Sequence, residues 1–339
     1  MILSIAFALI LRPDHYVFAA IVGVIALGFL LKSTETIDLY FRSVLKNKFS
    51  VLSKSIGLLL SGLFKIVFIL LGLNVLFFAF ANFLEAMITS VFLIIFFKKF
   101  SQRNFPFIDF RVNEAKRLLN DSWPLIFAGV FSMLFLHIDK AMLGAMAGDE
   151  PVGLYSAAVK VSTIFYFIPV AIKKSSYPII INSYEKDVKT FESRILKILT
   201  FMALISYLIA LFIAINSSHI VNIMFGLDYA KTAEILFIHI FSCIFVFSGL
   251  IRGPWVIVKN ITKFVLVTNL IGAIINISLN TIMIPKYGGI GAAWATLISY
   301  AIAYFFVNCL YSHTIRFFFL QIQAFLLIPY VKGVKNYLR

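Results

Sequence analysis

The chain contains about ten apolar stretches in series, separated by short polar loops. They lie at about residues 1–11, 16–32, 52–73, 75–97, 122–146, 153–172, 198–215, 235–257, 265–284 and 291–311. A helix needs about 20 apolar residues to cross the hydrocarbon core of a bilayer, and most of these stretches approach that length. Hydrophobic residues make up 61% of the chain, above the range of soluble proteins. The sequence therefore predicts an all-α, polytopic integral membrane protein.

The first stretch, residues 1–11, is too short to cross a bilayer as an ordinary helix. It has neither the basic segment nor the small-residue cleavage site of a signal peptide. We expect it to be the surviving end of a truncated helix.

Positive charge alternates between the loops. Loops on one side carry 23 Lys and Arg residues, and those on the other side carry only Arg12, Lys231 and Lys286. The positive-inside rule predicts that the crowded side, which includes the C-terminus, faces the cytoplasm. The net charge of +15 is thus a topology signal, and we expect no nucleic-acid partner. Cys243 and Cys309 lie in apolar stretches and are interpreted as packing residues.

One polar break, at residues 98–121, leaves four apolar stretches before it and six after it. It contains an amphipathic run from Phe110 to Leu119, suited to the membrane interface, and a predicted helix start at Asp121-Ser122, before Pro124. Transporters built of two repeats place a linker at such a point. We predict four parts: an incomplete N-terminal lobe at 1–97, a cytoplasmic linker at 98–121, a six-helix lobe at 122–311 and a basic cytoplasmic tail at 312–339.

Motifs of enzyme chemistry are missing from the sequence. It has no phosphate-binding G-x-x-x-x-G-K-[ST] loop, no H-E-x-x-H, no Cys/His cluster and no D-x-D pair. We therefore expect a protein without enzymatic activity, cofactor or metal site.

Six ionisable residues lie within the apolar stretches: Lys65, Glu85, Asp139, Lys140, Lys160 and Arg252. A charge at the centre of a bilayer costs about 2.5–3.5 kcal/mol, so each needs a partner or water. Helical rise places Lys65 level with Glu85, and Asp139 level with Lys160, across the turns that join sequential helices. We predict two ion pairs.

Two interpretations of these charges stay open. They are structural ion pairs, or they line a hydrated cavity in which four cations and two acids favour an anionic, phosphate-bearing substrate. His137 shares a helix face with Lys140 and is either a satisfied polar residue or a further donor. Arg252 lies close enough to the cytoplasmic end to snorkel to lipid phosphate instead of lining the cavity.

Other polar positions favour helix packing. Asn276 and Asn280 lie one turn apart and suit helix–helix hydrogen bonds at least as well as a ligand site. The run from Gly288 to Ala293 predicts a short turn followed by a closely packed helix.

Four segments resemble bacterial polysaccharide repeat-unit flippases of the multidrug/oligosaccharidyl-lipid/polysaccharide exporter superfamily: residues 37–54, 122–172, 224–236 and 272–300. The resemblance implies a two-lobed fold of twelve helices around a central cavity, of which this chain lacks the first two. It also implies the bacterial inner membrane, alternating access, and undecaprenyl-pyrophosphate-linked O-antigen or capsule units as substrate. Membrane lipids, a polysaccharide polymerase and a chain-length regulator are the implied partners.

Our hypothesis assigns substrate binding to Lys65, Lys140, Lys160, Arg252 and His137. Asp139 and Glu85 balance these charges or carry a coupled proton or cation. The alternatives are a drug/cation antiporter of the same superfamily, which favours an acidic cavity, and a membrane glycan polymerase or ligase, which needs a large external loop. An inactive fragment is the third alternative.

Overall fold

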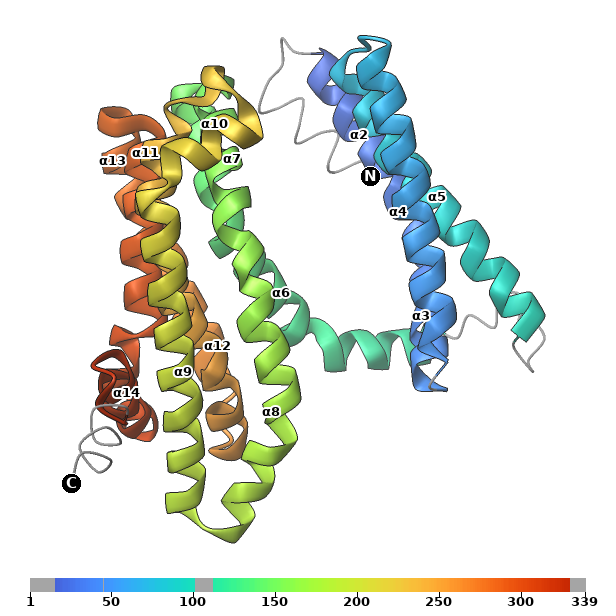
Figure 1. Cartoon of the computed structure of the whole chain (residues 1–339). Helices are drawn as coiled ribbons and strands as arrows, with labels where there is room; N and C mark the ends of the chain where they lie inside the picture. Colours follow the sequence, from blue (N-terminus) through green and yellow to red (C-terminus); the bar gives the residue numbers. More distant parts are fainter. Residues whose placement is uncertain (1–15, 45, 101–111, 330–339) are drawn as a thin grey trace. The chain divides into compact units, whose positions relative to one another are not determined.

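The computed structural model describes residues 16–44, 46–100 and 112–329, and every regular element in these ranges is a helix (Figure 1). The chain divides into two compact units, Met1–Val112 and Asn113–Arg339. The predicted first stretch, residue Phe110 and the last residues of the predicted tail lie outside the described residues.

Helix α5 is the centre of the first unit, because α2 and α4 both pack on it. Gly57 of α4 allows this close packing, since a Cβ atom there would lie 3.0 Å from the backbone oxygen of Glu85. Gly72 takes a positive φ of 62° in the turn between α4 and α5. The elements of this unit are α2 (Tyr16–Leu31), η1 (Lys32–Thr34), α3 (Glu35–Ser43), α4 (Asn47–Leu70) and α5 (Val75–Phe100).

The second unit is larger and has its own apolar core, in which the Trp255 ring stacks on Phe191 at 5.5 Å and contacts Phe317 at 5.6 Å. Its elements are α6 (Val112–Ala147), α7 (Asp149–Thr163), η2 (Ile164–Tyr166), α8 (Phe167–Lys186), α9 (Val188–Ile215), α10 (Ser217–Phe225), η3 (Leu227–Tyr229), α11 (Thr232–His239), α12 (Ser242–Val258), α13 (Lys263–Tyr304), η4 (Phe306–Cys309) and α14 (Ser312–Phe325).

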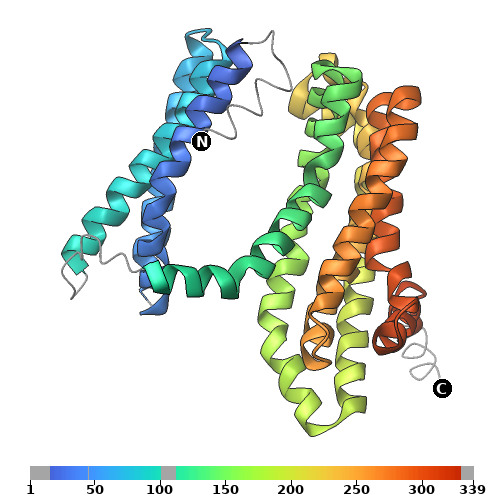
Figure 2. The same cartoon turned by 180° about the vertical axis from the view of Figure 1, so that it is seen from behind.

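Within the described residues, seven helices are long and apolar enough to cross a membrane. The last of them, Lys263–Cys309, contains two predicted spans, because α13 reverses direction at Gly288, where φ is 55°. The two halves run antiparallel (Figure 2), since Asn276 of the first half donates to Ser299 of the second half at 3.3 Å. The predicted turn and close packing at this glycine-rich run are therefore confirmed.

One predicted boundary is wrong. Helix α6 begins at Val112 and passes through Pro124 without the predicted start at Asp121-Ser122, because the polar segment before it is itself helical. Residues 312–325, predicted as the start of a tail, form α14, which packs against α9. Arg316 of α14 fixes that contact by donating from Nε and Nη2 to Glu192 Oε2 at 2.9 and 2.7 Å.

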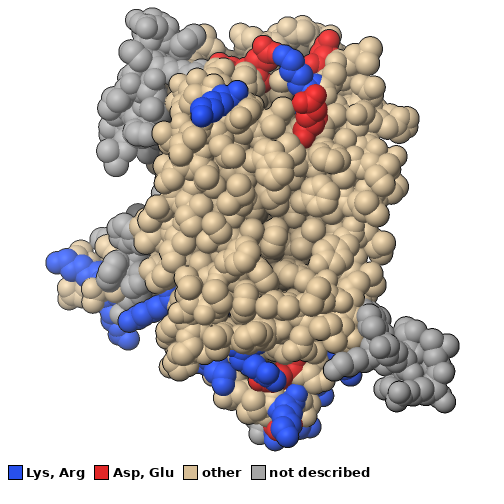
Figure 3. Space-filling view, turned by 90° about the vertical axis from the view of Figure 1, so that its left-hand side faces the viewer, with Lys and Arg blue, Asp and Glu red and all other residues tan. Residues whose placement is uncertain are grey.

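Charge in the second unit gathers at its two ends. Figure 3 shows a broad uncharged belt, with Lys and Arg mostly below it and Asp and Glu mostly above it. At the lower end, Asp187 caps α9 by accepting hydrogen bonds from the backbone N–H of Thr190 at 3.0 Å and from its hydroxyl at 3.1 Å. These bonds lower the pKa of Asp187 below its ordinary value, with the backbone bond from Thr190 as the largest cause. The helices are thus bounded by polar caps suited to the two membrane interfaces.

Candidate functional site

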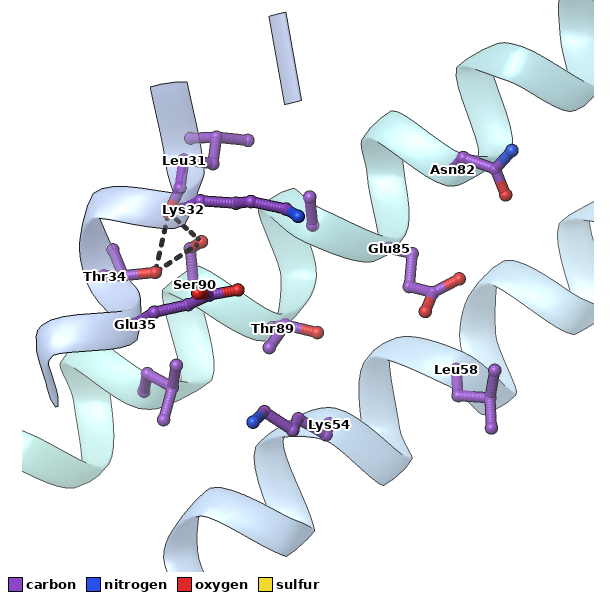
Figure 4. A pocket seen from close by; sticks show the side chains of 12 residues that line it. Leu31, Lys32, Thr34, Glu35, Lys54, Leu58, Asn82, Glu85, Thr89 and Ser90 are labelled. Carbon is purple, nitrogen blue, oxygen red and sulfur yellow. Dashed lines mark hydrogen bonds between the residues drawn. The ribbon is translucent and has the colours of Figure 1, made fainter. Parts of the chain in front are cut away.

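A cavity of about 500 Å³ lies in the first unit, between α2–η1 and α4, with α5 as its floor (Figure 4). One face of α5 presents Asn82, Glu85 and Thr89 to it, at helical spacing. Its other lining residues are Leu31, Lys32, Thr34, Glu35, Lys54, Leu58, Ala86, Ser90 and Leu93. The volume lies in the range of small-molecule sites.

The predicted ion pair in this unit is confirmed. Lys65 Nζ lies 3.9 Å from Glu85 Oε2, and Ser61 donates to the same oxygen at 3.0 Å. The two charged side chains are 33% and 36% exposed, so the pair is partly hydrated. Glu85 is among the residues that line the cavity, and Lys65 supplies its countercharge.

Sequence reasoning missed the other charges of this cavity. It treated Lys32 and Lys54 only as topology signals, but both line the cavity together with Glu35. Lys54 also binds Asp38 at 2.7 Å. The spacing of Asn82, Glu85 and Thr89 on one helix face was the signal that could have revealed the site.

The second site surrounds Asp139 of α6, which is 4% exposed. Its carboxylate accepts hydrogen bonds from the Tyr155 hydroxyl and from Thr296 Oγ1, the latter at 3.2 Å. The backbone N–H of Lys140 donates to the other carboxylate oxygen at 3.1 Å. Three helices, α6, α7 and α13, therefore meet at one buried carboxylate.

The predicted ion pair between Asp139 and Lys160 is wrong. Tyr155 occupies the place expected for Lys160, and Lys160 is exposed. Tyr155 and Lys160 point in directions about 140° apart around the axis of α7, at 3.6 residues per turn. The prediction matched the depth of the two charges but took no account of their direction around the helix axis.

Buried amides continue this network along α13. Asn280 Nδ2 donates to Asn276 Oδ1 at 2.9 Å, and Asn276 in turn reaches Ser299, whose hydroxyl donates to the backbone oxygen of Thr296. The helix–helix role predicted for the two asparagines is thus confirmed. Asn280 Oδ1, however, is buried and has no hydrogen-bond partner among the residues that the structure describes. An unpartnered buried acceptor costs about 1–3 kcal/mol, which makes it available to a cation or a donor.

Arg252 is 3% exposed, so it does not snorkel to the membrane surface. Its guanidinium donates to the Ala303 backbone oxygen at 3.1 Å, Asn308 Oδ1 at 3.1 Å and Thr268 Oγ1 at 2.9 Å. The ring of Phe264 lies 5.3 Å from its central carbon. Arg252 therefore holds the end of α13 beside α12, a structural role that its sequence position did not indicate.

The remaining candidates lie on accessible faces of the second unit. Lys160 and His137 are exposed and Lys140 is half-buried. Lys160 lies near the middle of the span Asp149–Tyr177. Among the described residues, no acidic side chain forms an ion pair with Lys140 or Lys160. These two lysines differ in this respect from Lys65.

Comparison with known proteins supports a transporter fold. The family described as "Polysaccharide biosynthesis protein" matches residues 1–184, more than half of the chain. The chain belongs to this family. The MatE family also matches, over residues 124–282.

Two curated relatives of the family are each 25% identical to the chain. One is the probable low-salt glycan biosynthesis flippase Agl15 of Haloferax volcanii, which matches over 56% of this chain and 40% of its own length. The other is the capsular polysaccharide biosynthesis protein CapF of Staphylococcus aureus, which matches over 53% of this chain and 46% of its own length. The match therefore spans less than half of each relative.

Two solved structures share the fold. An inward-facing multidrug resistance MATE family transporter of the MOP superfamily superposes with a TM-score of 0.74 over 92% of this chain and 72% of its own, at 13% identity. The lipid II flippase MurJ, in an inward closed conformation, superposes with a TM-score of 0.65 over 95% of this chain and 74% of its own, at 16% identity. The predicted all-helical exporter fold is confirmed.

Proposed function

We propose that the chain acts in a flippase that moves lipid-linked oligosaccharides across a membrane by alternating access. The name of one curated relative, a probable glycan biosynthesis flippase, supports glycan transport, and the other relative is named for capsular polysaccharide biosynthesis. The substrate class that we propose is a polyprenyl pyrophosphate, such as undecaprenyl pyrophosphate, bearing a short glycan unit.

Lys160 is the observation that carries this proposal. It lies near the middle of a membrane span, is exposed on the second unit, and has no acidic partner among the described residues. A lysine facing acyl chains at that depth costs about 2.5–3.5 kcal/mol, so we place it against a water-filled path. An ammonium group in such a path suits a phosphate-bearing substrate. Lys140 and His137 add donors to that path.

In this proposal, Asp139 is the coupling site for a proton or a monovalent cation. Its carboxylate, the Tyr155 and Thr296 hydroxyls and the free Asn280 Oδ1 form an oxygen-rich, buried set along the two halves of α13. Hard cations prefer oxygen ligands. Binding there would alter the contacts between α6, α7 and α13, and so bias the second unit between two arrangements. Glu85 is the corresponding acid in the first unit.

The location and partners are part of the same proposal. The alternation of charge along the loops supports a cytoplasmic C-terminus, and the proposed location is a bacterial inner membrane. A polysaccharide polymerase and a chain-length regulator are the proposed consumers of the flipped glycan.

Flipping in proteoliposomes tests the proposal. The probe is a polyprenyl pyrophosphate carrying one fluorescently labelled N-acetylglucosamine, and dithionite quenching reports the labels in the outer leaflet. We expect the chain to accelerate flipping, Lys160→Ala to lower the rate about tenfold, which corresponds to one lost charge-assisted contact, and Lys160→Arg to retain most of it.

Lys231→Ala is the matched control, because Lys231 is exposed and lies outside the middle of the spans. Equal rates for the unaltered chain and Lys160→Ala would remove Lys160 from the path. Transport of a cationic dye without flipping of the probe would favour the drug antiporter instead.

A further inference from the structure

Helices α7 and α8 form one long rod joined by the 3₁₀ turn η2, and one face of it is uncovered. The rod runs along an edge of the second unit in Figure 1. Lys160, Ile164, Phe167, Val170 and Lys174 are all exposed on it. The spacing of these residues, three or four apart, is that of a single helix face.

The 3₁₀ turn brings Lys174 closer to the direction of Lys160, from about 40° in a continuous α-helix to about 20°. An α-helix turns about 100° per residue and a 3₁₀ helix about 120°. With Ile164–Tyr166 in 3₁₀ geometry, the direction of Lys174 differs from that of Lys160 by only about 20°. Pro169 explains the turn, because it has no N–H to donate to the backbone oxygen of Phe165.

The two lysines lie at different depths. The intervening helix rises by about 22 Å, with Lys160 near the middle of the span and Lys174 near its end at Tyr177. The exposed side chains between them are apolar: Ile164 is 56% and Phe167 67% exposed. The face therefore offers two cationic positions separated by an uncharged stretch.

Lys173, the neighbour of Lys174, differs from it in direction and packing. It points about 80° away from Lys160, and its Nζ lies 3.1 Å from the position of a Cβ atom added to Gly253 of α12. Its half-buried stem thus packs between helices. Among the described residues, neither Lys173 nor Lys174 forms an ion pair, so the two differ in direction and packing but not in charge.

We propose that Lys174 is a binding site for the diphosphate group of the lipid-linked substrate at the lower membrane boundary, and that the group moves from Lys174 to Lys160 along this face. The inference rests on the proposed flippase function. Lys174 supplies a charge-assisted hydrogen bond where the headgroup first leaves the lipid surface, and Lys160 supplies the next one at mid-depth. The apolar stretch holds the headgroup weakly, so it can leave the first site.

Flipping kinetics in liposomes of phosphatidylcholine alone test this inference, with the initial rate measured against the surface density of the labelled probe. Lys174→Ala is expected to raise the half-saturating density about fivefold to tenfold and to change the maximal rate by less than about twofold. Lys160→Ala is expected to lower the maximal rate. Lys174→Arg should restore the density dependence, and Lys173→Ala should match the unaltered chain.

Several outcomes would overturn the inference. If Lys174→Ala and Lys173→Ala have the same effect, only general surface charge matters. If the Lys174→Ala defect appears only after phosphatidylglycerol is added, the partner of Lys174 is ordinary anionic phospholipid. If the unaltered chain flips the probe and Lys174→Ala is unaffected, this inference alone fails. A chain that neither flips nor binds the probe refutes the proposed function as well.

Discussion

Gly291→Ala should destabilise the second unit, because the second half of α13 crosses the first half at this glycine. A Cβ atom at Gly291 would lie 2.6 Å from the Met283 carbonyl carbon, nearer than ordinary van der Waals contact. The obstacle is backbone, so neither helix half can yield by a side-chain rotation. Overpacking of this kind costs about 1–3 kcal/mol, which the better helix propensity of alanine offsets by about 0.5–1 kcal/mol.

The net loss of up to about 2.5 kcal/mol corresponds to a fall in Tm of up to about 10 °C for a unit of this size. Thermal unfolding of the purified chain in detergent measures it. Gly153→Ala is the matched control, since nothing lies within 4 Å of a Cβ atom there, and it should keep or raise Tm. A Tm for Gly291→Ala equal to or above that of Gly153→Ala would show that the two halves do not meet at this point.

Three further predictions concern single side chains. Tyr155→Phe removes a donor to the buried Asp139 carboxylate and should lower stability by about 1–3 kcal/mol, measured as a shift in Tm. Arg252→Lys cannot reproduce the three guanidinium bonds and should lower Tm by several degrees, whereas an unchanged Tm would contradict the structural role of Arg252. Asp187→Ala should lower Tm at pH 7, and the difference should shrink as the pH falls below about 4: the folded-state pKa of Asp187 is lowered, so its stabilisation is fully present above the ordinary pKa and is lost as the pH falls through the folded-state pKa. A pH-independent difference would rule out the charged cap.

The sequence predicted the spans between residues 16 and 97 and between 153 and 311 well, because helix length and apolar content are local properties. It also predicted the ion pair of Lys65 with Glu85. These residues lie on two helices joined by a tight turn, at the same depth and on the sides of the helices that face each other. The same reasoning failed for Asp139, because its partner depends on direction around the axis, and that is set by packing against α13.

Arg252 shows a second limit of sequence reasoning. Its acceptors include Ala303 and Asn308, more than fifty positions along the chain, and none of them is acidic. A search for opposite charges could not find them. Two cavity residues of the first unit, Lys32 and Lys54, were missed for a related reason. In the sequence they look like the loop lysines that mark membrane topology, and only the fold places them around α5.

Pro169 has a consequence beyond its own turn. Without it, a regular α-helix would continue through residues 164–166, and every residue that follows would rotate by about 60° relative to Lys160. Lys174 would then lie about 40° to the other side of the direction of Lys160, although no charged residue had changed. The closeness of two distant ammonium groups in direction thus depends on one absent amide hydrogen, and replacement of this imino acid would shift it while leaving hydropathy and net charge almost untouched.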